Sequence, residues 1–154
     1  SLFSIDILLD SNFKIIDYDI KDKVFWIGKG TISYDMNATY QWLIYKKINY
    51  KEIDGNINFL KVVNSEIRKV DQNIQLINNF NRFSFIDNSN INIYKLYSLY
   101  NHNLYKTGGP LVVYLINNKI SKESVLVYGL VNAPGVSKNM LIKELETTIL
   151  NSNF

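Results

Sequence analysis

The stretch from residue 111 to residue 131 has the sequence LVVYLINNKISKESVLVYGLV and includes the longest unbroken apolar run of the chain, Leu111 to Ile116. A second apolar run, Ser124 to Val131, follows after the polar link Asn117-Asn118-Lys119, which is typical of a hairpin. Both runs carry apolar residues on both faces of an extended strand. We therefore expect two neighbouring strands that lie inside a sheet and not at its edge.

Further β-rich runs lie on the N-terminal side of this hairpin. Phe3 to Ile7 alternates apolar and polar residues, as a half-buried strand does. Phe13 to Asp19 and Val24 to Gly28 are two runs joined by a link of hairpin length. Tyr40 to Tyr45 is dense in aromatic and β-branched residues, which predicts a central strand.

Two segments have the period of an amphipathic helix. The first extends from about Asn56 to Asp71, and Asp54-Gly55-Asn56 supplies a turn and an N-cap before it. The second follows Ser137, which is a suitable N-cap. The expected apolar faces of the two helices consist of Leu60, Val63, Ile67 and Val70 in the first and Leu141, Ile142, Leu145 and Ile149 in the second.

Two remaining segments have weaker patterns. Residues 72–92 have no clear period, although Phe83 and Phe85 alternate as in a short strand. Ile93 to Tyr105 fits both helical spacing and the composition of a strand. Its tyrosines and the Gly108-Gly109-Pro110 turn that we expect after it favour a strand.

The order of these elements predicts an α+β fold. Because links of hairpin length join most strands, we expect a mainly antiparallel sheet covered by the two amphipathic helices. With 154 residues and 47% hydrophobic residues, the chain is long and apolar enough to form one core. We expect a single α+β domain over residues 1–154.

Composition excludes several classes of function. The chain has no cysteine, which excludes a disulfide framework, a thiolate zinc site and a cysteine nucleophile. Its net charge of +3 comes from scattered lysines with only two arginines, so we expect no nucleic-acid partner. No apolar run approaches the ~20 residues of a transmembrane helix. The N-terminal residues meet Asp6 early and lack a basic start, so we expect no signal peptide within this chain.

No motif predicts catalysis, a metal or a cofactor. His102 is the one histidine and has no nucleophile or second nitrogen ligand beside it, so we expect it to be solvated or structural. Asp17, Asp19 and Asp22 match only the start of a calcium loop, and we interpret them as a solvated hairpin. Gly28-Lys29-Gly30-Thr31 lacks the earlier glycine and the helix of a phosphate loop. We therefore expect a protein that is not an enzyme and has no cofactor.

Aromatic residues and two turns are the remaining candidates for binding. Most aromatic side chains in the predicted strands should be core, and an exposed subset would mark an interface. The turns expected at residues 108–110 and 133–135 combine a rigid backbone with a strand end, although turn chemistry alone accounts for the same residues. The candidate binding residues are Tyr105, Gly108, Gly109, Pro110, Ala133 and Pro134, and the aromatic set is Trp26, Trp42, Tyr45, Tyr94, Tyr97, Tyr100, Tyr105 and Tyr114.

Several short motifs occur in an order that matches a known bacterial family. They are Val24-Phe25-Trp26-Ile27, Trp42-Leu43-Ile44-Tyr45, Gly108-Gly109-Pro110-Leu111-Val112, and Gly129 to Pro134 followed by Lys138 and Glu144-Leu145-Glu146. On these motifs the chain resembles the C-terminal half of the bacterial domain-of-unknown-function family 4837. The resemblance implies an exported, lipoprotein-like envelope protein, located in the periplasm or at the outer membrane, with a lipid anchor on the parent protein.

The order of helices and strands is also similar to that of the PsbP-like α/β/α sandwich, whose members often serve as accessory subunits of envelope or membrane complexes. We therefore expect a non-enzymatic accessory or scaffolding domain of the bacterial cell envelope that binds another protein through exposed aromatic residues or a sheet edge. The alternative is a small-molecule-binding domain with an aromatic-lined pocket on the concave face of the sheet.

Overall fold

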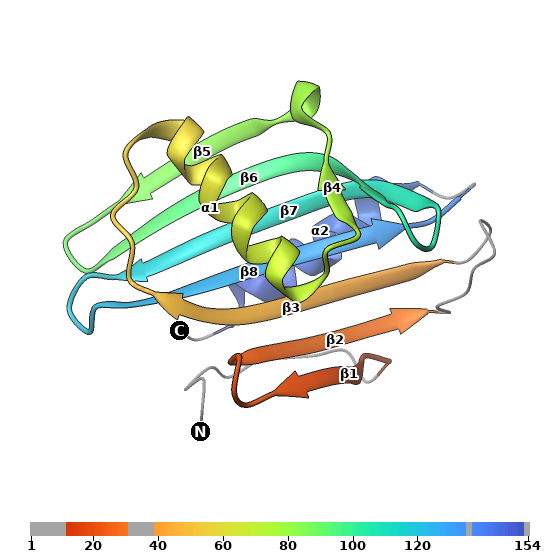
Figure 1. Ribbon diagram of the computed structural model, residues 1–154, viewed down its shortest axis with the longest axis horizontal. Coiled ribbons are helices and arrows are strands. Elements are labelled where there is room, and N and C mark those ends of the chain that lie inside the picture. The colour runs from red at the N-terminus through yellow and green to blue at the C-terminus, as the bar shows by residue number, and fades with distance from the viewer. Residues whose placement is uncertain (1–11, 31–38, 135–136, 153–154) are drawn as a thin grey trace.

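The computed structural model describes residues 12–30, 39–134 and 137–152 (Figure 1). The strand predicted at Phe3 to Ile7 and the turn residue Gly135 lie outside these residues. In chain order the elements are β1 (Lys14–Asp19), β2 (Val24–Gly30), β3 (Tyr40–Asn49), α1 (Gly55–Val70), β4 (Ile74–Leu76), the 3-10 helix η1 (Asn78–Phe80), β5 (Arg82–Asp87), β6 (Ile91–His102), β7 (Thr107–Asn118), β8 (Glu123–Asn132) and α2 (Lys138–Leu150).

Within the described residues, all the strands belong to one eight-stranded sheet in which every pair is antiparallel. The strand order is β1-β2-β3-β8-β7-β6-β4, and β5 also pairs with β6, next to β4 along the same side. The predicted α+β class and antiparallel sheet are therefore confirmed. The interior positions predicted for the hairpin β7–β8 and for β3 are confirmed as well.

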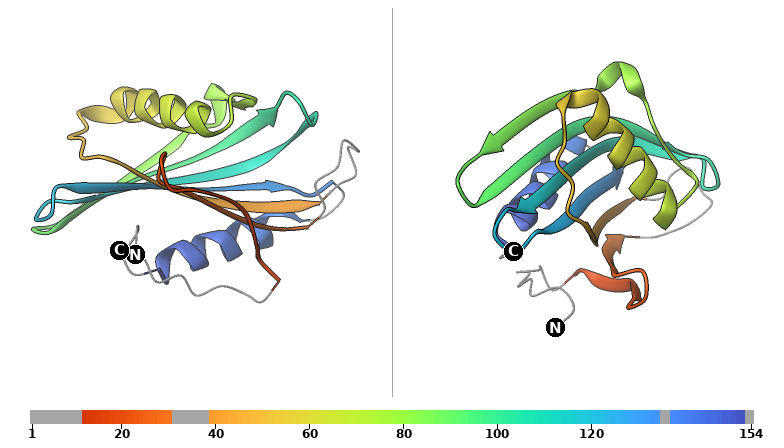
Figure 2. Two further views of the ribbon diagram at one scale, coloured as in Figure 1. Left: turned by 60° about the horizontal axis from the view of Figure 1, so that its bottom comes forward. Right: turned by 60° about the vertical axis from the view of Figure 1, so that its left-hand side comes forward.

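The sheet is the middle of three layers, with α1 on one face and α2 on the other (Figure 2). Neighbouring residues of β3 point to opposite faces of the sheet, and both faces are apolar. Trp42 faces the core under α1, whereas Leu43 faces the core under α2. From the helices, Phe59 and Val63 of α1 join the first core and Leu145 of α2 joins the second. The two faces are thus buried separately, and the likeness to the PsbP-like sandwich stays a prediction.

Residues 72–105 contain more strand than their patterns predicted. The predicted strand from residue 93 is confirmed as β6, and the alternation of Phe83 and Phe85 is confirmed as β5. Before β5, the chain also forms β4 and η1, which no sequence pattern had indicated. Both β4 and β5 pair with β6, so this segment completes one side of the sheet.

The turn predicted at Gly108-Gly109-Pro110 is wrong, because these residues lie in β7. The chain reverses earlier, at residues 103–106, where Lys106 has a φ of 55°. Pro110 lacks a backbone N–H, which a strand between two neighbours cannot lose without cost. It is tolerated here because residues 107–110 pair with β6 alone, and the pairing with β8 begins at Leu111.

Three hairpin loops of equal length share one backbone feature. The loops 20–23, 103–106 and 119–122 each end in a lysine with a φ of 55°, namely Lys23, Lys106 and Lys122. This left-handed conformation is where glycine or asparagine is usual, since a Cβ atom is strained there. None of the three loops contains glycine or proline, and the one at residues 103–106 is the turn that the sequence patterns misplaced.

We expect Lys106→Gly to raise the free energy of unfolding by about 0.5–1 kcal/mol, because relief of the left-handed strain exceeds the extra entropy of glycine in the unfolded chain. Urea denaturation measures the change. Lys106→Ala is the control, since it removes the same side chain but keeps the Cβ atom. If alanine stabilises as much as glycine, the lysine side chain and not the backbone is the cause.

Candidate functional site

The two segments predicted to carry function do lie side by side at one end of the sheet. The amide of Gly108 donates a hydrogen bond to Oδ1 of Asn132 at 3.3 Å. A Cβ atom on Gly109 would lie 2.1 Å from the carbonyl oxygen of Val131 and 3.8 Å from Cδ of Lys138. The glycine pair therefore permits β7, the end of β8 and the start of α2 to approach one another closely.

The other predicted residues do not converge with this pair on one open surface. Tyr105 stacks on His102 with ring centroids 4.3 Å apart. Pro110 and Ala133 are buried, whereas Pro134 is exposed. The binding role of these residues stays a prediction, and the close packing at Gly109 gives that residue a structural role.

We expect Gly109→Ala to lower the free energy of unfolding by about 3 kcal/mol, because the new Cβ atom would meet the backbone of β8 and not a side chain that can move. Thermal and urea denaturation measure the loss. Lys138→Ala is the control, since it removes the neighbouring side chain and should change stability little. A Gly109→Ala protein of unchanged stability that no longer binds its partner would contradict the structural role.

His102, at the end of β6, is structural as predicted, and it is not solvated. Its ring is only 1% exposed and packs against Trp42 and Tyr105. Nδ1 accepts a hydrogen bond from the amide of Tyr105 at 3.1 Å, so the ring proton is on Nε2, which donates to Asp71 at 2.8 Å. Both ring nitrogens are engaged, which leaves none for acid–base chemistry.

The surroundings of His102 are a buried polar network. Burial alone would raise the pKa of the Asp71 carboxyl, but hydrogen bonds from His102 and Asn73 outweigh it and hold the pKa below its usual value. The hydroxyl of Tyr40 lies 2.9 Å from that of Tyr100 and 2.7 Å from that of Thr107. These bonds satisfy polar groups between α1 and the sheet, where an unpaired group would be costly.

The aromatic residues of the predicted set belong to the cores. Trp42, Tyr45, Tyr100 and Tyr114 are buried, and the other four are half-buried. The core interpretation is confirmed, and an interface formed by exposed aromatic residues of this set is wrong. None of the eight residues is fully exposed, because their rings help to cover the two faces of the sheet.

Several exposed apolar side chains lie instead on β1 and β5, at opposite edges of the sheet. On β1, Ile15 and Tyr18 are exposed, but a β-bulge interrupts its pairing with β2 between Ile15 and Asp17. On β5, Phe85 is 52% and Ile86 60% exposed, and the pairing with β6 has no interruption. A bulge protects an edge strand against pairing with another chain, so β5 is the unprotected edge.

An apolar groove adjoins β5 on the face that carries α2. Ile86 pairs in register with Ile93, and Ile93 with Ile116, which makes an isoleucine row across three strands. The groove has a volume of about 250 Å³, and Ile93, Ile91 and Leu150 are among its lining residues. We define the β5 surface as Phe85, Ile86, Ile91, Ile93 and Leu150 together with the outer edge of β5.

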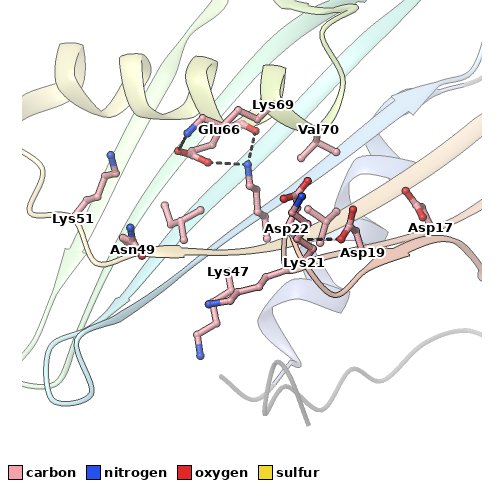
Figure 3. Close-up of a pocket in the computed structure, with 14 residues that line it drawn as sticks. Asp17, Asp19, Lys21, Asp22, Lys47, Asn49, Lys51, Glu66, Lys69 and Val70 are labelled. Atoms are coloured by element: carbon pink, nitrogen blue, oxygen red, sulfur yellow. Dashed lines mark hydrogen bonds and ion pairs between the residues drawn. The ribbon is translucent and has the colours of Figure 1, made fainter.

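A second surface feature is a cleft on the face that carries α1 (Figure 3). Its volume is about 650 Å³, and it lies between the β1–β2 hairpin, the end of β3 and the last turns of α1. We call it the charged cleft. Its lining includes the lysines Lys21, Lys23, Lys46, Lys47, Lys51 and Lys69 and the acids Asp17, Asp19, Asp22 and Glu66.

Glu66 holds the helical wall of the charged cleft to the sheet. Its carboxylate lies 2.8 Å from Nζ of Lys46 and 2.8 Å from Nζ of Lys69. Lys46 also donates a hydrogen bond to the carbonyl oxygen of Glu66 at 3.3 Å. Burial alone would raise the pKa of Glu66, but the bonds from the two lysines outweigh it and lower the pKa.

We expect Glu66→Gln to lower the free energy of unfolding by about 3 kcal/mol at pH 7, because Lys46 remains buried without a counter-ion. The pKa of Glu66 is lower in the folded state, so its contribution is present above the unfolded-state pKa and is lost as the pH falls through the folded-state pKa. Urea denaturation at neutral and acid pH should show the two proteins converge in acid.

Glu123→Gln is the matched control for this prediction. It removes the exposed carboxylate that pairs with Lys47 at the rim of the charged cleft. An exposed ion pair contributes little, so stability should hardly change at either pH. A gap between wild type and Glu66→Gln that stays constant in acid would show that charge is not the cause.

The β1–β2 hairpin forms another wall of the charged cleft, and its carboxylates are bonded differently from that of Glu66. Asp17 accepts a hydrogen bond from the amide of Tyr18 at 2.8 Å, and Asp19 accepts one from the amide of Asp22 at 3.0 Å. No lysine or arginine of the described ranges forms an ion pair with either carboxylate. Over those same ranges, no group of three or more His, Asp or Glu residues could hold a metal ion.

Comparison with known proteins finds a solved structure with a similar fold but no matching family. No family model matches the chain, and neither does any curated protein. The crystal structure of LpqN, involved in cell envelope biogenesis of Mycobacterium tuberculosis, is similar with a TM-score of 0.50 and 11% sequence identity. The match covers 97% of this chain and 82% of LpqN. At this identity the likeness shows the fold, and the resemblance to family 4837 stays a prediction.

The length and composition of the two helices bear on whether a helix of this chain can cross a membrane. Neither α1 nor α2, the helices of the described part of the chain, is long and apolar enough to cross a bilayer.

Proposed function

We propose that the chain is a non-enzymatic accessory domain of the bacterial cell envelope that binds another protein at the β5 surface. The observation that carries the proposal is the uninterrupted edge strand β5 with exposed Phe85 and Ile86. The outer side of an edge strand presents unpaired N–H and C=O groups, which an extended segment of a second chain can pair with. The described residues supply no strand on that side.

The side chains of β5 offer a different contact on each face of the sheet. Phe85 stands on the face of α1, where its ring lies 4.6 Å from that of Tyr94. Ile86 stands on the face of α2 and leads into the groove that Ile93 and Leu150 line. An added strand would place alternate side chains against each of these contacts. Main-chain bonds would provide affinity and the two apolar contacts would provide specificity.

A role without catalysis is supported by the state of His102. The side chain has both nitrogens engaged and its ring excluded from solvent. A general base needs a free nitrogen within reach of a substrate proton. The polar network around it therefore supports a structural role between α1 and the sheet.

An envelope location is supported by two likenesses of different kinds. The fold is similar to that of LpqN, a protein involved in cell envelope biogenesis. The short motifs between Val24 and Glu146 resemble those of family 4837, whose members are envelope proteins similar to lipoproteins. The proposed location is the periplasm or the outer membrane, with a lipid anchor on the parent protein.

The alternative, a small-molecule site lined by aromatic rings, has one observation in its favour. A groove of about 600 Å³ has Tyr40 and Trp42 among its lining residues, beside Gly28 and Gly30. Both rings are only 1% exposed, so they offer a ligand almost no surface. Stacking on an aromatic face requires that the face be open, which favours the protein partner at the β5 surface.

A photo-crosslinking residue tests the proposed surface directly. Placed at Ile86 in cells of the source organism, it should give one discrete adduct, whereas the same residue at Ile120 should not. Ile120 is the matched control, since it is also an exposed isoleucine but lies in the β7–β8 loop. Adducts of equal yield and identity at both positions would contradict a specific surface.

The partner identified in this way should then be purified and its affinity measured. We expect Ile86→Lys to raise the Kd about tenfold or more, because a charge would enter an apolar contact. Ile120→Lys should leave the Kd unchanged. If Ile86→Lys folds normally, as circular dichroism would show, and binds as tightly as wild type, the proposal is wrong.

A further inference from the structure

The open edge of β5 is available to a second copy of this chain as well as to a partner. Its six residues, Arg82-Phe83-Ser84-Phe85-Ile86-Asp87, form an unbroken ladder with β6, and the described residues supply no strand on the other side. An edge of this kind is a template for pairing with another edge. Whether two β5 strands suit each other depends on which residues a symmetric pairing sets opposite one another.

Symmetry fixes the direction of such a pairing and limits its register. Two identical edges joined by a twofold axis perpendicular to the sheet run antiparallel, and directly opposed residues point to the same face of the joined sheet. Because successive residues of a strand alternate between the faces, the axis must pass through a residue and not between two residues. Ser84 and Phe85 are the two residues nearest the middle of β5, so an axis at either keeps most of the strand paired.

The side chains of β5 distinguish these two registers. An axis at Phe85 would set Asp87 opposite Phe83 of the second copy, which is a charge against an aromatic ring. An axis at Ser84 sets Phe83 opposite Phe85 of the second copy, on both sides of the axis, and sets the two Ser84 hydroxyls opposite each other. Aromatic pairs and hydroxyl pairs are both favourable between neighbouring strands, so the residues of β5 favour the axis at Ser84.

On the face of α1, this register extends aromatic contacts that each copy already has. The ring of Phe83 lies edge-on to that of Phe59, with centroids 6.2 Å apart, and the ring of Phe85 lies 4.6 Å from that of Tyr94. Setting Phe83 opposite Phe85 of the second copy joins these contacts into one aromatic row that crosses the axis. Phe85 is 52% exposed in the single chain, and the row would cover it.

The charges at the ends of β5 favour the antiparallel direction as well. Arg82 is exposed and forms no ion pair with a described residue. With the axis at Ser84, its alkyl stem would lie over Ile86 of the second copy, one residue from Asp87 of that copy. Asp87 pairs with Lys119 of its own chain, but a carboxylate can accept several donors. A parallel pairing would instead bring like charges together at each end.

We propose that two copies of the chain pair through β5 about a twofold axis at Ser84, and that this pairing covers the β5 surface until a partner displaces the second copy. The proposal rests on the function proposed above, because it assigns a competitor to the same surface. The pair is closed, since the opposite edge strand β1 is interrupted by a bulge. A ladder of six residues is smaller than a standard interface, so the pair should dissociate on dilution and yield to a partner.

Two oppositely charged variants test the axis at Ser84. Sedimentation equilibrium should show the mass of the wild-type chain rise from that of one copy towards that of two between about 1 µM and about 1 mM. Ser84→Asp and Ser84→Lys each set like charges face to face, so each should weaken the pairing about tenfold or more, and an equimolar mixture should restore it. A wild-type chain that stays a single copy would overturn the proposal, and so would a mixture that pairs no better than either variant alone.

Ser65→Asp and Ser65→Lys are the matched controls, since Ser65 is also an exposed serine but lies on α1. Both should pair as the wild type does, and equal losses at Ser65 and Ser84 would overturn the register. A single cysteine gives a second readout, because the chain has no cysteine. Ser84→Cys sets two thiols within reach of a disulfide, so a mild oxidant should link it about tenfold faster than Ser65→Cys. Equal rates would overturn the proposal.

The partner found by crosslinking at Ile86 separates this proposal from the one on which it rests. The disulfide-linked Ser84→Cys dimer should bind the purified partner about tenfold more weakly than the reduced chain, because its ladder is occupied. Equal binding would overturn the covering of the β5 surface. A chain that pairs with itself but gives no partner adduct at Ile86 would contradict the proposed function alone. A chain that binds a partner there but never pairs with itself would contradict the self-pairing alone.

Discussion

The structure depends on the burial of both faces of a single sheet. Adjacent residues of β3, Trp42 and Leu43, enter two different cores, and each core is closed by one helix. Burial of apolar surface is the main favourable contribution to folding, and here it requires large side chains on every central strand. Most aromatic residues of the central strands are used for this purpose. The exposed apolar residues Phe85 and Ile86 therefore lie at the perimeter of the sheet, on the edge strand β5.

Two contacts made by carboxylates fix the C-terminal end of α1 above that sheet. Glu66 reaches Lys46 on β3, and Asp71, directly after the helix, reaches His102 on β6. Between them they span the sheet, since β3 and β6 are separated by β8 and β7. Apolar packing alone tolerates small shifts of a helix, whereas the buried ion pair of Glu66 and the directional hydrogen bond to Asp71 require one position. The same contacts set the width of the charged cleft, because its helical wall ends at Lys69 and Val70.

Sequence patterns predicted the elements whose signals are local. Each of these signals lies within one short segment of the sequence. They are the apolar runs of β3, β7 and β8 and the helical periods of α1 and α2. Two kinds of feature were missed. The turn before β7 was placed at Gly108-Gly109-Pro110 because its left-handed residue is Lys106, a type that carries no turn signal. The charged cleft and the pair of His102 with Asp71 join residues far apart in the chain, which no local pattern connects.

The outer side of β6 is shared by two strands in succession, β4 and then β5, with η1 between them. This arrangement sets a limit on any segment that pairs with β5. The open edge has six residues, about 20 Å at the rise of an extended chain, and the polypeptide leaves the plane of the ladder at η1. A partner would therefore be recognised as a short linear motif and not as a folded surface. Only the motif would contact β5, so substitutions elsewhere in the partner would not affect binding. Outside the motif, the sequences of this chain and of the partner could then change almost independently during evolution.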